Sequence, residues 1–245
     1  MKHVERCRKA FTSPDYLIKC WAEDGLINGD TSLLGRKTLL ILGGGFSLVP
    51  KVLGDIVEDV SGSLHTIRVW RLKEADASII ALAGGSAYVE AVMAMLCLSS
   101  VEKIYAMGWC GSLDEEIRPG DILIAYAAVR GDGTTCRYVD PEYPAVADPV
   151  HVIDLYHKLR TYGLRPKLSI IYTTSTHLRE KEILEKWKGK AQCSVLYIIS
   201  RLLGIPSVAA LVVSDTLVHK YRDVYSTVNV AEKLLKILVE IMKEH

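Results

Sequence analysis

The sequence has no excess of either charge. Its 245 residues include 30 Lys and Arg against 29 Asp and Glu, so the formal net charge is +1. A chain so close to neutrality has no overall field to attract nucleic acid or an acidic membrane surface. The composition therefore argues against a polyanion-binding protein, and we expect neither nucleic acid nor a membrane as a partner.

Long apolar runs are also missing. The longest, such as residues 207–213, have the length of a strand, whereas a bilayer-spanning helix needs roughly 20 residues. The first nine residues are charged and lack the apolar core of a signal peptide. An apolar fraction of 49% allows one large domain to bury its own core. These features predict a soluble cytoplasmic protein.

Side-chain amides and paired cysteines are scarce. The chain has two Asn and one Gln, a depletion that is reported for proteins of hot-living organisms. Six cysteines, at positions 7, 20, 97, 110, 136 and 193, form no CxxC pair, and the seven His residues lack metal-ligand spacing. We therefore expect reduced thiols, no metal and no disulfide framework.

Short apolar runs alternate with helical patterns along the chain. The runs cover residues 38–42, 78–83, 103–107, 121–129, 168–172 and 208–213, and the helical patterns cover 87–98, 150–162 and 194–203. Continuous apolar strands interleaved with helices are typical of a sheet that is buried on both faces. The pattern predicts an α/β fold, in which one mixed, mostly parallel central sheet is covered by helices on both faces.

The last segment has the pattern of a helix that packs on this sheet. Asn229 is a good N-cap, and an apolar stripe follows with Lys and Glu opposite it. The stripe consists of Val230, Leu234, Ile237, Leu238 and Ile241. We expect it to serve core packing.

The domain organisation is simple, because no repeat, low-complexity tract or linker divides the sequence. We expect residues 38–245 to form one domain. Residues 1–37 place Phe11, Tyr16 and Trp21 among charges. That N-terminal extension could pack on the domain, cover a neighbour's site or hang loose.

Ligands of open α/β sheets bind beyond the carboxyl ends of the strands. That rule selects the turns at residues 43–45, 84–86, 108–112, 173–177 and 214–215. Free N–H groups at glycine turns suit phosphate, but tight turns also need glycine for structural reasons. Neither GxGxxG nor GxxxxGK[ST] is present, so the turns alone do not identify a ligand.

Among the polar residues at these turns, Asp215 follows a buried strand directly. Its carboxyl group could carry a proton in catalysis, or Ser214 or Asp215 could cap the next helix. Cys110 and Cys136 could be nucleophiles, although no Cys-His pairing is visible and small buried cysteines are common. His177 is a candidate polar residue of a pocket.

Several ordered stretches resemble the trimeric or hexameric nucleoside phosphorylase family, which includes purine nucleoside phosphorylase, uridine phosphorylase and the methylthioadenosine and adenosylhomocysteine nucleosidases. The resemblance covers roughly residues 38–243. Its most specific part is GWCGSL at 108–113 followed by IRPGDI at 117–122. VRGDGTT at 129–135, Tyr138, YPAVADP at 143–149 and VVSD at 212–215 follow in the family's order.

The resemblance implies cleavage of the glycosidic C–N bond of a purine-type nucleoside. Asp215 matches the family's proton donor to the base, and Ala191-Gln192 matches its ribose-binding pair. Cys110, Gly111, Ser214 and the Thr176-His177 turn would line the base site. The resemblance also implies a homo-oligomer, from dimer to hexamer, and no cofactor other than inorganic phosphate as a possible co-substrate.

Phosphate is expected, weakly, at Gly44, Gly85, Ser86 and Trp109, because this chain departs from the family on that side. Ala106 and Trp109 stand where phosphorylases carry an arginine and a serine or threonine, and only Lys51 follows the first glycine loop. An alanine cannot grip phosphate as a guanidinium does.

A third departure is Gln192, which replaces the glutamate that holds ribose in the family. A neutral amide has one acceptor oxygen and no charge, so it stabilises a cationic sugar less well. The sequence therefore leaves two hypotheses. The first is a nucleoside-cleaving enzyme, a phosphorylase or a hydrolytic nucleosidase, and the second is a catalytically altered relative that binds a nucleoside or serves in assembly.

Overall fold

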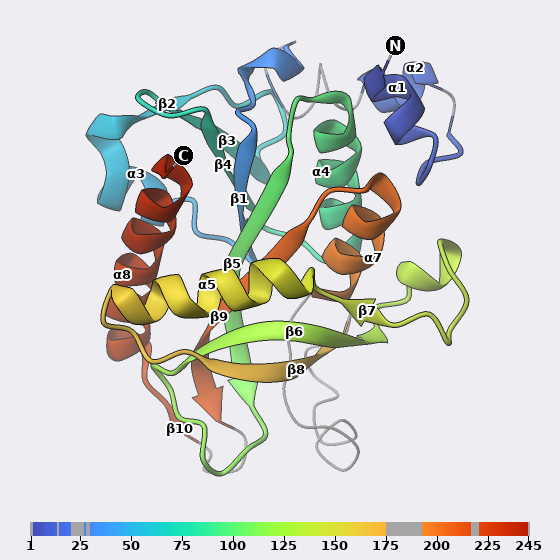
Figure 1. Cartoon of the computed structure of the whole chain (residues 1–245). Helices are drawn as coiled ribbons and strands as arrows, with labels where there is room; N and C mark the ends of the chain where they lie inside the picture. The colour runs from blue at the N-terminus through green and yellow to red at the C-terminus, as the bar shows by residue number, and fades with distance from the viewer. Residues whose placement is uncertain are drawn as a thin grey trace.

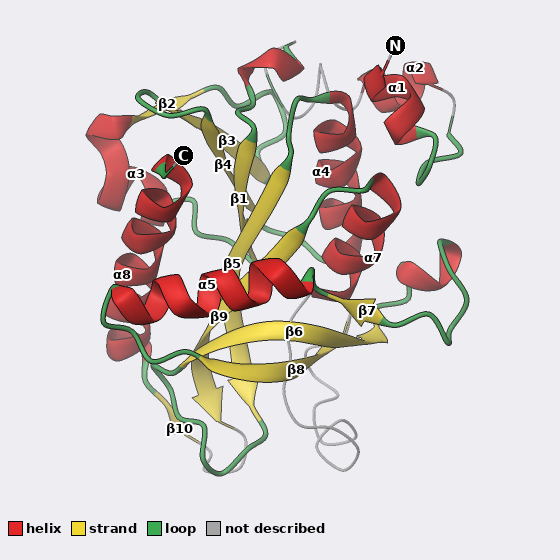
Figure 2. Ribbon diagram, in the orientation of Figure 1, coloured by secondary structure: helices red, strands yellow, loops and turns green. Residues whose placement is uncertain are grey.

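The computed structural model describes residues 2–13, 15–20, 27, 30–174, 193–216 and 221–244. Within these ranges ten strands form one sheet, with helices on both of its faces (Figures 1 and 2). The strands are β1 (Lys37–Leu42), β2 (Val57–Asp59), β3 (Ile67–Leu72), β4 (Ala77–Leu82), β5 (Lys103–Ser112), β6 (Ile122–Gly131), β7 (Ala145–Val146), β8 (Lys167–Thr174), β9 (Ser207–Thr216) and β10 (Tyr221–Arg222). The helices are α1 (Lys2–Cys7), α2 (Asp15–Cys20), α3 (Leu48–Leu53), α4 (Ser86–Leu98), α5 (Pro149–Thr161), α7 (Cys193–Leu203) and α8 (Val224–Lys243).

Four parallel strands form the middle of the sheet. Its order is β2-β3-β4-β1-β5-β9-β6-β7, and β10 and β8 pair with β9 and β6. The pairs β4·β1, β1·β5 and β5·β9 are parallel, and antiparallel strands flank them on both sides. The predicted fold class, a mixed and mostly parallel α/β sheet, is confirmed.

Helices cover both faces of the central strands, which explains the continuous apolar runs. All six side chains of β4 are buried, and so are those of residues 38–42 in β1. Helices α4 and α7 pack together on one face, and α8 packs with α3 on the other (Figure 1). Alternation between apolar and polar residues is lost because neither face of these strands meets water. No helix in the described ranges has the length and apolar character to cross a bilayer.

Two of the predicted turns lie inside strands, so those predictions were wrong. Residues 108–112 continue β5, and Ser214 and Asp215 continue β9. A Cβ atom at Gly108 would lie 2.9 Å from the carbonyl oxygen of Leu42. Gly108 therefore permits the close approach of β5 to β1 and does not mark a turn.

The last helix begins earlier than predicted. Helix α8 starts at Val224, with Asp223 as the N-cap accepting a hydrogen bond from the backbone N–H of Ser226. Asn229, predicted to be the N-cap, lies inside the helix. The apolar stripe is correct: four of its residues are buried and Val230 is partly buried against the core.

Helix α1 of the N-terminal extension packs on the domain. A disulfide joins Cys7 of α1 to Cys97 of α4, so the expectation of reduced thiols was wrong for this pair. The guanidinium of Arg6 donates hydrogen bonds to four carbonyl oxygens at the end of α4, including those of Leu96 at 2.8 Å and Val101 at 2.9 Å. The pairing was not visible in the sequence, because the two cysteines lie 90 residues apart and meet only through the fold.

Breaking this disulfide is expected to destabilise the protein. A closed loop of this length lowers the entropy of the unfolded chain, and the loss corresponds to about 4 kcal/mol. Under oxidising conditions Cys97→Ser should melt about 10 °C below the wild type, as followed by circular dichroism. Cys20→Ser, which replaces an exposed free cysteine, is the matched control. Equal melting temperatures for Cys97→Ser and the wild type would contradict this role.

Candidate active site at the ends of β5 and β9

Asp215 and Gly111 face each other at the carboxyl ends of two neighbouring parallel strands. The β5·β9 register runs regularly up to Cys110 opposite Val213, and it resumes with Gly111 opposite Asp215. Ser214 is therefore the extra residue of a β-bulge, which redirects the side chain that follows it. A Cβ atom at Gly111 would lie 2.9 Å from Asp215 Oδ2. The carboxylate thus approaches the β5 backbone so closely that only glycine leaves it room.

The Asp215 carboxylate keeps one oxygen available. Its Oδ1 lies 2.6 Å from the Ser214 hydroxyl, which is also 3.3 Å from the Cys110 carbonyl oxygen. No group in the described ranges donates a hydrogen bond to Oδ2. The residue is half-buried. Since α8 is capped by Asp223, the alternative in which Asp215 caps the next helix is wrong.

The first turn of α7 lies beside this pair. Burial raises the pKa of the Cys110 thiol, and the neighbouring Cys193 and Asp215 raise it further. Burial also raises the pKa of Cys193, to about 12. Both thiols are therefore protonated near neutral pH and are poor nucleophiles. Cys110 is better suited to lining a site than to attacking a substrate.

A buried carboxylate, Asp132, fixes the start of α7. Asp132 is 4% exposed and follows β6 directly. It accepts hydrogen bonds from the backbone N–H groups of Thr134 and Thr135 at 2.7 Å, and from the Ser194 hydroxyl at 2.6 Å. The Ser194 backbone N–H in turn donates to Thr173 Oγ1 of β8 at 3.1 Å. The Asp132 carboxylate thus joins the loop after β6 to the start of α7, and Ser194 joins that start to β8.

The loop after Asp132 is held by Arg130. Its guanidinium donates to Thr135 Oγ1 at 3.0 Å and to the carbonyl oxygens of Val139 and Tyr143 at 2.9 Å. This loop belongs to the stretch that resembles the family's substrate-side loop. The N-terminal extension supports it, because the ring of Phe11 meets Tyr138 edge-on at 6.2 Å between centroids.

Of the predicted phosphate positions, Gly44 follows β1, Gly85 and Ser86 follow β4, and Trp109 lies within β5. The backbone N–H of Gly44, where φ is +121°, donates to the Leu82 carbonyl oxygen at 2.8 Å, so this amide is already engaged. Gly85 is the N-cap of α4 and offers no side chain to its N–H groups. The Ser86 hydroxyl is buried without a hydrogen-bond partner in the described ranges. An unpaired hydroxyl beside a helix N-terminus suits an anion.

These positions are spread across the sheet. Strand β4 lies three strand spacings from β9, so the start of α4 is separated from Asp215 by about 14 Å. Trp109 is half-buried and lies two residues before Gly111, so the pleat of β5 places both on the same face. Trp109 therefore shares the face of β5 that Asp215 approaches.

The departures from the family pattern lie where a cation would be needed. Ala106 is fully buried inside β5, between Leu40 and Ala209 of the neighbouring strands. The ammonium of Lys51 lies 2.5 Å from Glu232 Oε1 of α8, so its charge is already paired. Neither position offers a free cation to phosphate.

Four predicted site residues, Thr176, His177, Ala191 and Gln192, lie outside the described residues. No role for Asp132 or Ser194 was predicted from the sequence. The motif that contains Asp132 was noted only for its resemblance, and nothing in the spacing indicates that its carboxylate meets Ser194 62 residues later. In the described ranges no three His, Cys, Asp or Glu residues are grouped as metal ligands would be.

Comparison with protein families gives a match over most of the chain. The family model described as the phosphorylase superfamily matches residues 62–243. The uridine phosphorylase of Haemophilus influenzae is 32% identical over 90 residues, covering 37% of this chain and 36% of that protein. The DeoD-type purine nucleoside phosphorylase of Caldanaerobacter subterraneus subsp. tengcongensis is 29% identical over 128 residues, covering 48% of this chain and 54% of that protein. The aligned stretches thus span about a third to a half of these relatives.

Solved structures are similar over nearly the whole chain. The purine nucleoside phosphorylase of Toxoplasma gondii in complex with immucillin-H has a TM-score of 0.80 at 16% identity, covering 90% of this chain and 96% of that one. The uridine phosphorylase of Vibrio fischeri has a TM-score of 0.74 at 17% identity, covering 93% and 97%. At such identities the likeness shows the fold alone.

The Asp132 cluster predicts a pH-dependent loss of stability. Burial acts to raise the pKa of this carboxyl, but hydrogen bonds from Ser194, Thr135 and Thr134 outweigh it and hold the pKa below its usual value. The folded pKa is lower than the unfolded pKa of about 3.9. The stabilisation is therefore complete above about pH 4 and is lost as the pH falls through the folded pKa.

Asp132→Asn should lower the free energy of unfolding by about 3 kcal/mol at neutral pH, because an amide has one acceptor oxygen for several donors. Urea denaturation at several pH values measures the effect. The difference in the free energy of unfolding between the variant and the wild type should become smaller below about pH 4. Asp140→Asn, at an exposed position of the same loop, serves as the control. If the difference in the free energy of unfolding stayed constant in acid, the role of the ionised carboxylate would be contradicted.

Proposed function

The chain belongs to the phosphorylase superfamily, and on that premise we propose that it cleaves the N-glycosidic bond of a purine-type nucleoside. The observation that carries the proposal is the Asp215 carboxylate, which is half-buried at the end of β9 with Oδ2 unpaired in the described ranges. A carboxyl group in this setting can donate a proton to a heterocyclic nitrogen. The fold places it where open α/β sheets bind ligands.

The proposed reaction needs one proton transfer and one displacement. The protonated Asp215 carboxyl donates its proton to a ring nitrogen of the base, while the C1′–N bond breaks and its electron pair goes to the base. An oxygen of a phosphate anion then bonds to C1′ of the sugar, or a water oxygen does so and releases one of its protons to solvent. The Ser214 hydroxyl, 2.6 Å from Oδ1, holds the carboxyl so that Oδ2 remains for the base.

A proton-donating side chain favours a purine. Purine ring nitrogens accept protons as the base departs, and the resemblance assigns such an aspartate to purine-cleaving members. The sequence relatives are divided between uridine and purine nucleoside phosphorylases, so the choice of base rests on Asp215. Cys110 and Gly111 would line the base site, and Gln192 would hold the ribose.

Hydrolysis is the second candidate, and a specific observation favours it over phosphorolysis. Ala106 is buried between two strands and Lys51 is paired with Glu232, so neither can bind phosphate as a guanidinium would. Among the described residues of the proposed phosphate side, the buried Ser86 hydroxyl has no hydrogen-bond partner and could donate to an anion. The absence of these phosphate-binding cations is also consistent with a relative that binds a nucleoside without cleaving it. The experiment below distinguishes such a binder from an enzyme.

Base release from adenosine, inosine, guanosine and methylthioadenosine, with and without phosphate, tests the proposal. We expect release of a purine base, and Asp215→Asn should lower kcat about a hundredfold or more because a positioned general acid contributes at least that much. Phosphate dependence would identify phosphorolysis, and release without phosphate would identify hydrolysis.

The matched control is Asp55→Asn, which removes an exposed carboxylate far from the β5 and β9 ends. It should retain full activity, and both variants should melt like the wild type. If no base were released either with or without phosphate, the proposed catalysis would be contradicted. Calorimetric binding of a nucleoside in that case would identify the altered binder.

A further inference from the structure

A cavity lies at the opposite end of the strands from Asp215, where β9 begins. It has a volume of about 410 Å³ and lies between the first turn of α5, the last turns of α7 and the segment 204–207 that leads into β9. We call it the edge cavity; Asp148, His151, Tyr197, Arg201, Pro206 and Ser207 are among its lining residues. Ser207 is eight residues before Asp215 on β9, so the two places are about 26 Å apart.

Of the charged groups in the edge cavity, Asp148 has hydrogen-bond partners and Arg201 has none in the described ranges. Asp148 caps α5: its Oδ1 accepts from the His151 backbone N–H at 3.1 Å and lies 2.7 Å from His151 Nδ1. Its charge is thus engaged by the helix N-terminus and by the ring. Arg201 is exposed and has no ion pair or side-chain hydrogen bond in the described ranges. A guanidinium with five free N–H donors is therefore the uncompensated charge of the cavity.

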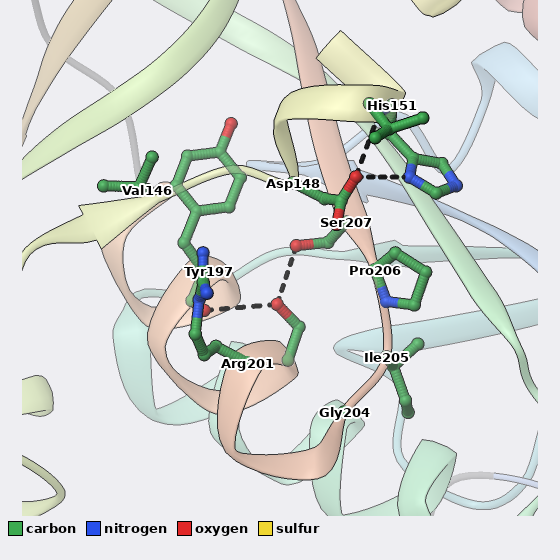
Figure 3. A pocket seen from close by; sticks show the side chains of 11 residues that line it. Val146, Asp148, His151, Tyr197, Arg201, Gly204, Ile205, Pro206 and Ser207 are labelled. Atoms are coloured by element: carbon green, nitrogen blue, oxygen red, sulfur yellow. Dashed lines mark hydrogen bonds and ion pairs between the residues drawn. The ribbon is translucent and has the colours of Figure 1, made fainter.

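Asp148 holds the His151 ring in an orientation that would let the ring contact a bound ligand. Its contact with Asp148 engages Nδ1 and leaves Nε2, which has no partner in the described ranges. Figure 3 shows Arg201 and Tyr197 on one side of the cavity, and His151, Asp148 and Pro206 on the other. An acidic group between the two sides would meet the guanidinium and face an imidazole that a carboxylate already orients.

The rest of the lining is apolar or already hydrogen-bonded. The Tyr197 hydroxyl donates to the Ala125 carbonyl oxygen, and the buried Ser200 and Ser207 hydroxyls bond to each other at 2.7 Å. Val146 and Pro206, which are partly exposed, offer apolar surface, whereas the Tyr197 ring behind them is buried. The volume lies in the range of small-molecule sites, which combine apolar walls with a few polar groups that fix the ligand.

We propose that the edge cavity binds a small organic acid whose carboxylate or phosphate group lies on Arg201 and whose compact apolar body packs against Val146 and Pro206. Guanidinium groups bind both kinds of anion through paired N–H donors. The site is independent of the nucleoside-cleaving function proposed above, because it lies at the other end of β9 and contains none of the residues invoked there.

Benzoate and phenyl phosphate are suitable probes, and benzyl alcohol is their uncharged counterpart. Binding is followed by NMR through the ring Hε1 signal of His151, which is assigned by its loss in His151→Gln. We expect saturable shifts with one or both acids and none with the alcohol. A response to benzoate alone or to phenyl phosphate alone identifies the preferred acid, and either supports the proposal.

Arg201→Gln should weaken binding of the acid by about tenfold or more, because it removes a charge-assisted contact. Arg165→Gln, an exposed arginine outside the cavity, should bind like the wild type, and so should Asp215→Asn. Three results would overturn the proposal: no saturable shift with either acid, unchanged affinity in Arg201→Gln, or loss of binding in Asp215→Asn, which would place the acid in the other site.

Discussion

The approach of the Asp215 carboxylate to the β5 backbone is the contact on which the site depends. Parallel strands in regular register would have set Ser214 opposite Gly111, and the bulge replaces it with Asp215. The carboxylate then occupies space that any side chain larger than glycine would take. A strand end, one extra residue and one glycine together fix a carboxyl group whose Oδ2 accepts no hydrogen bond from the described residues.

Hydrogen bonds and a disulfide fix α7, which begins beside Cys110, and the elements that contact it. Asp132, in the loop that follows β6, accepts a hydrogen bond from Ser194 at the start of α7. Arg130 stabilises the conformation of the same loop by donating hydrogen bonds to its backbone carbonyl groups. The Cys7–Cys97 disulfide ties the N-terminal extension to α4, and Phe11 carries that support to the loop. The buried and hydrogen-bonded carboxylate of Asp132 fixes this geometry, since each lost partner would leave an unsatisfied group.

Sequence patterns predicted the layers of this fold well, because apolar runs report burial directly and both faces of β1 and β4 are covered. Contacts between residues far apart in the chain were not predictable in the same way. The Cys7–Cys97 bond and the Asp132 cluster depend on how whole elements pack. The ends of β5 and β9 were misjudged because Gly108 and Ser214 look like turn residues, whereas close strand packing and a bulge use the same small side chains.

The most direct test of the account is a crystal structure of Asp215→Asn with a bound purine nucleoside. The account predicts that a nitrogen of the base lies about 3 Å from the side chain of residue 215, which is hydrogen-bonding reach for a proton donor, with Gly111 beside the base. A nucleoside bound elsewhere on the protein, or a residue 215 side chain turned away from the base, would contradict it.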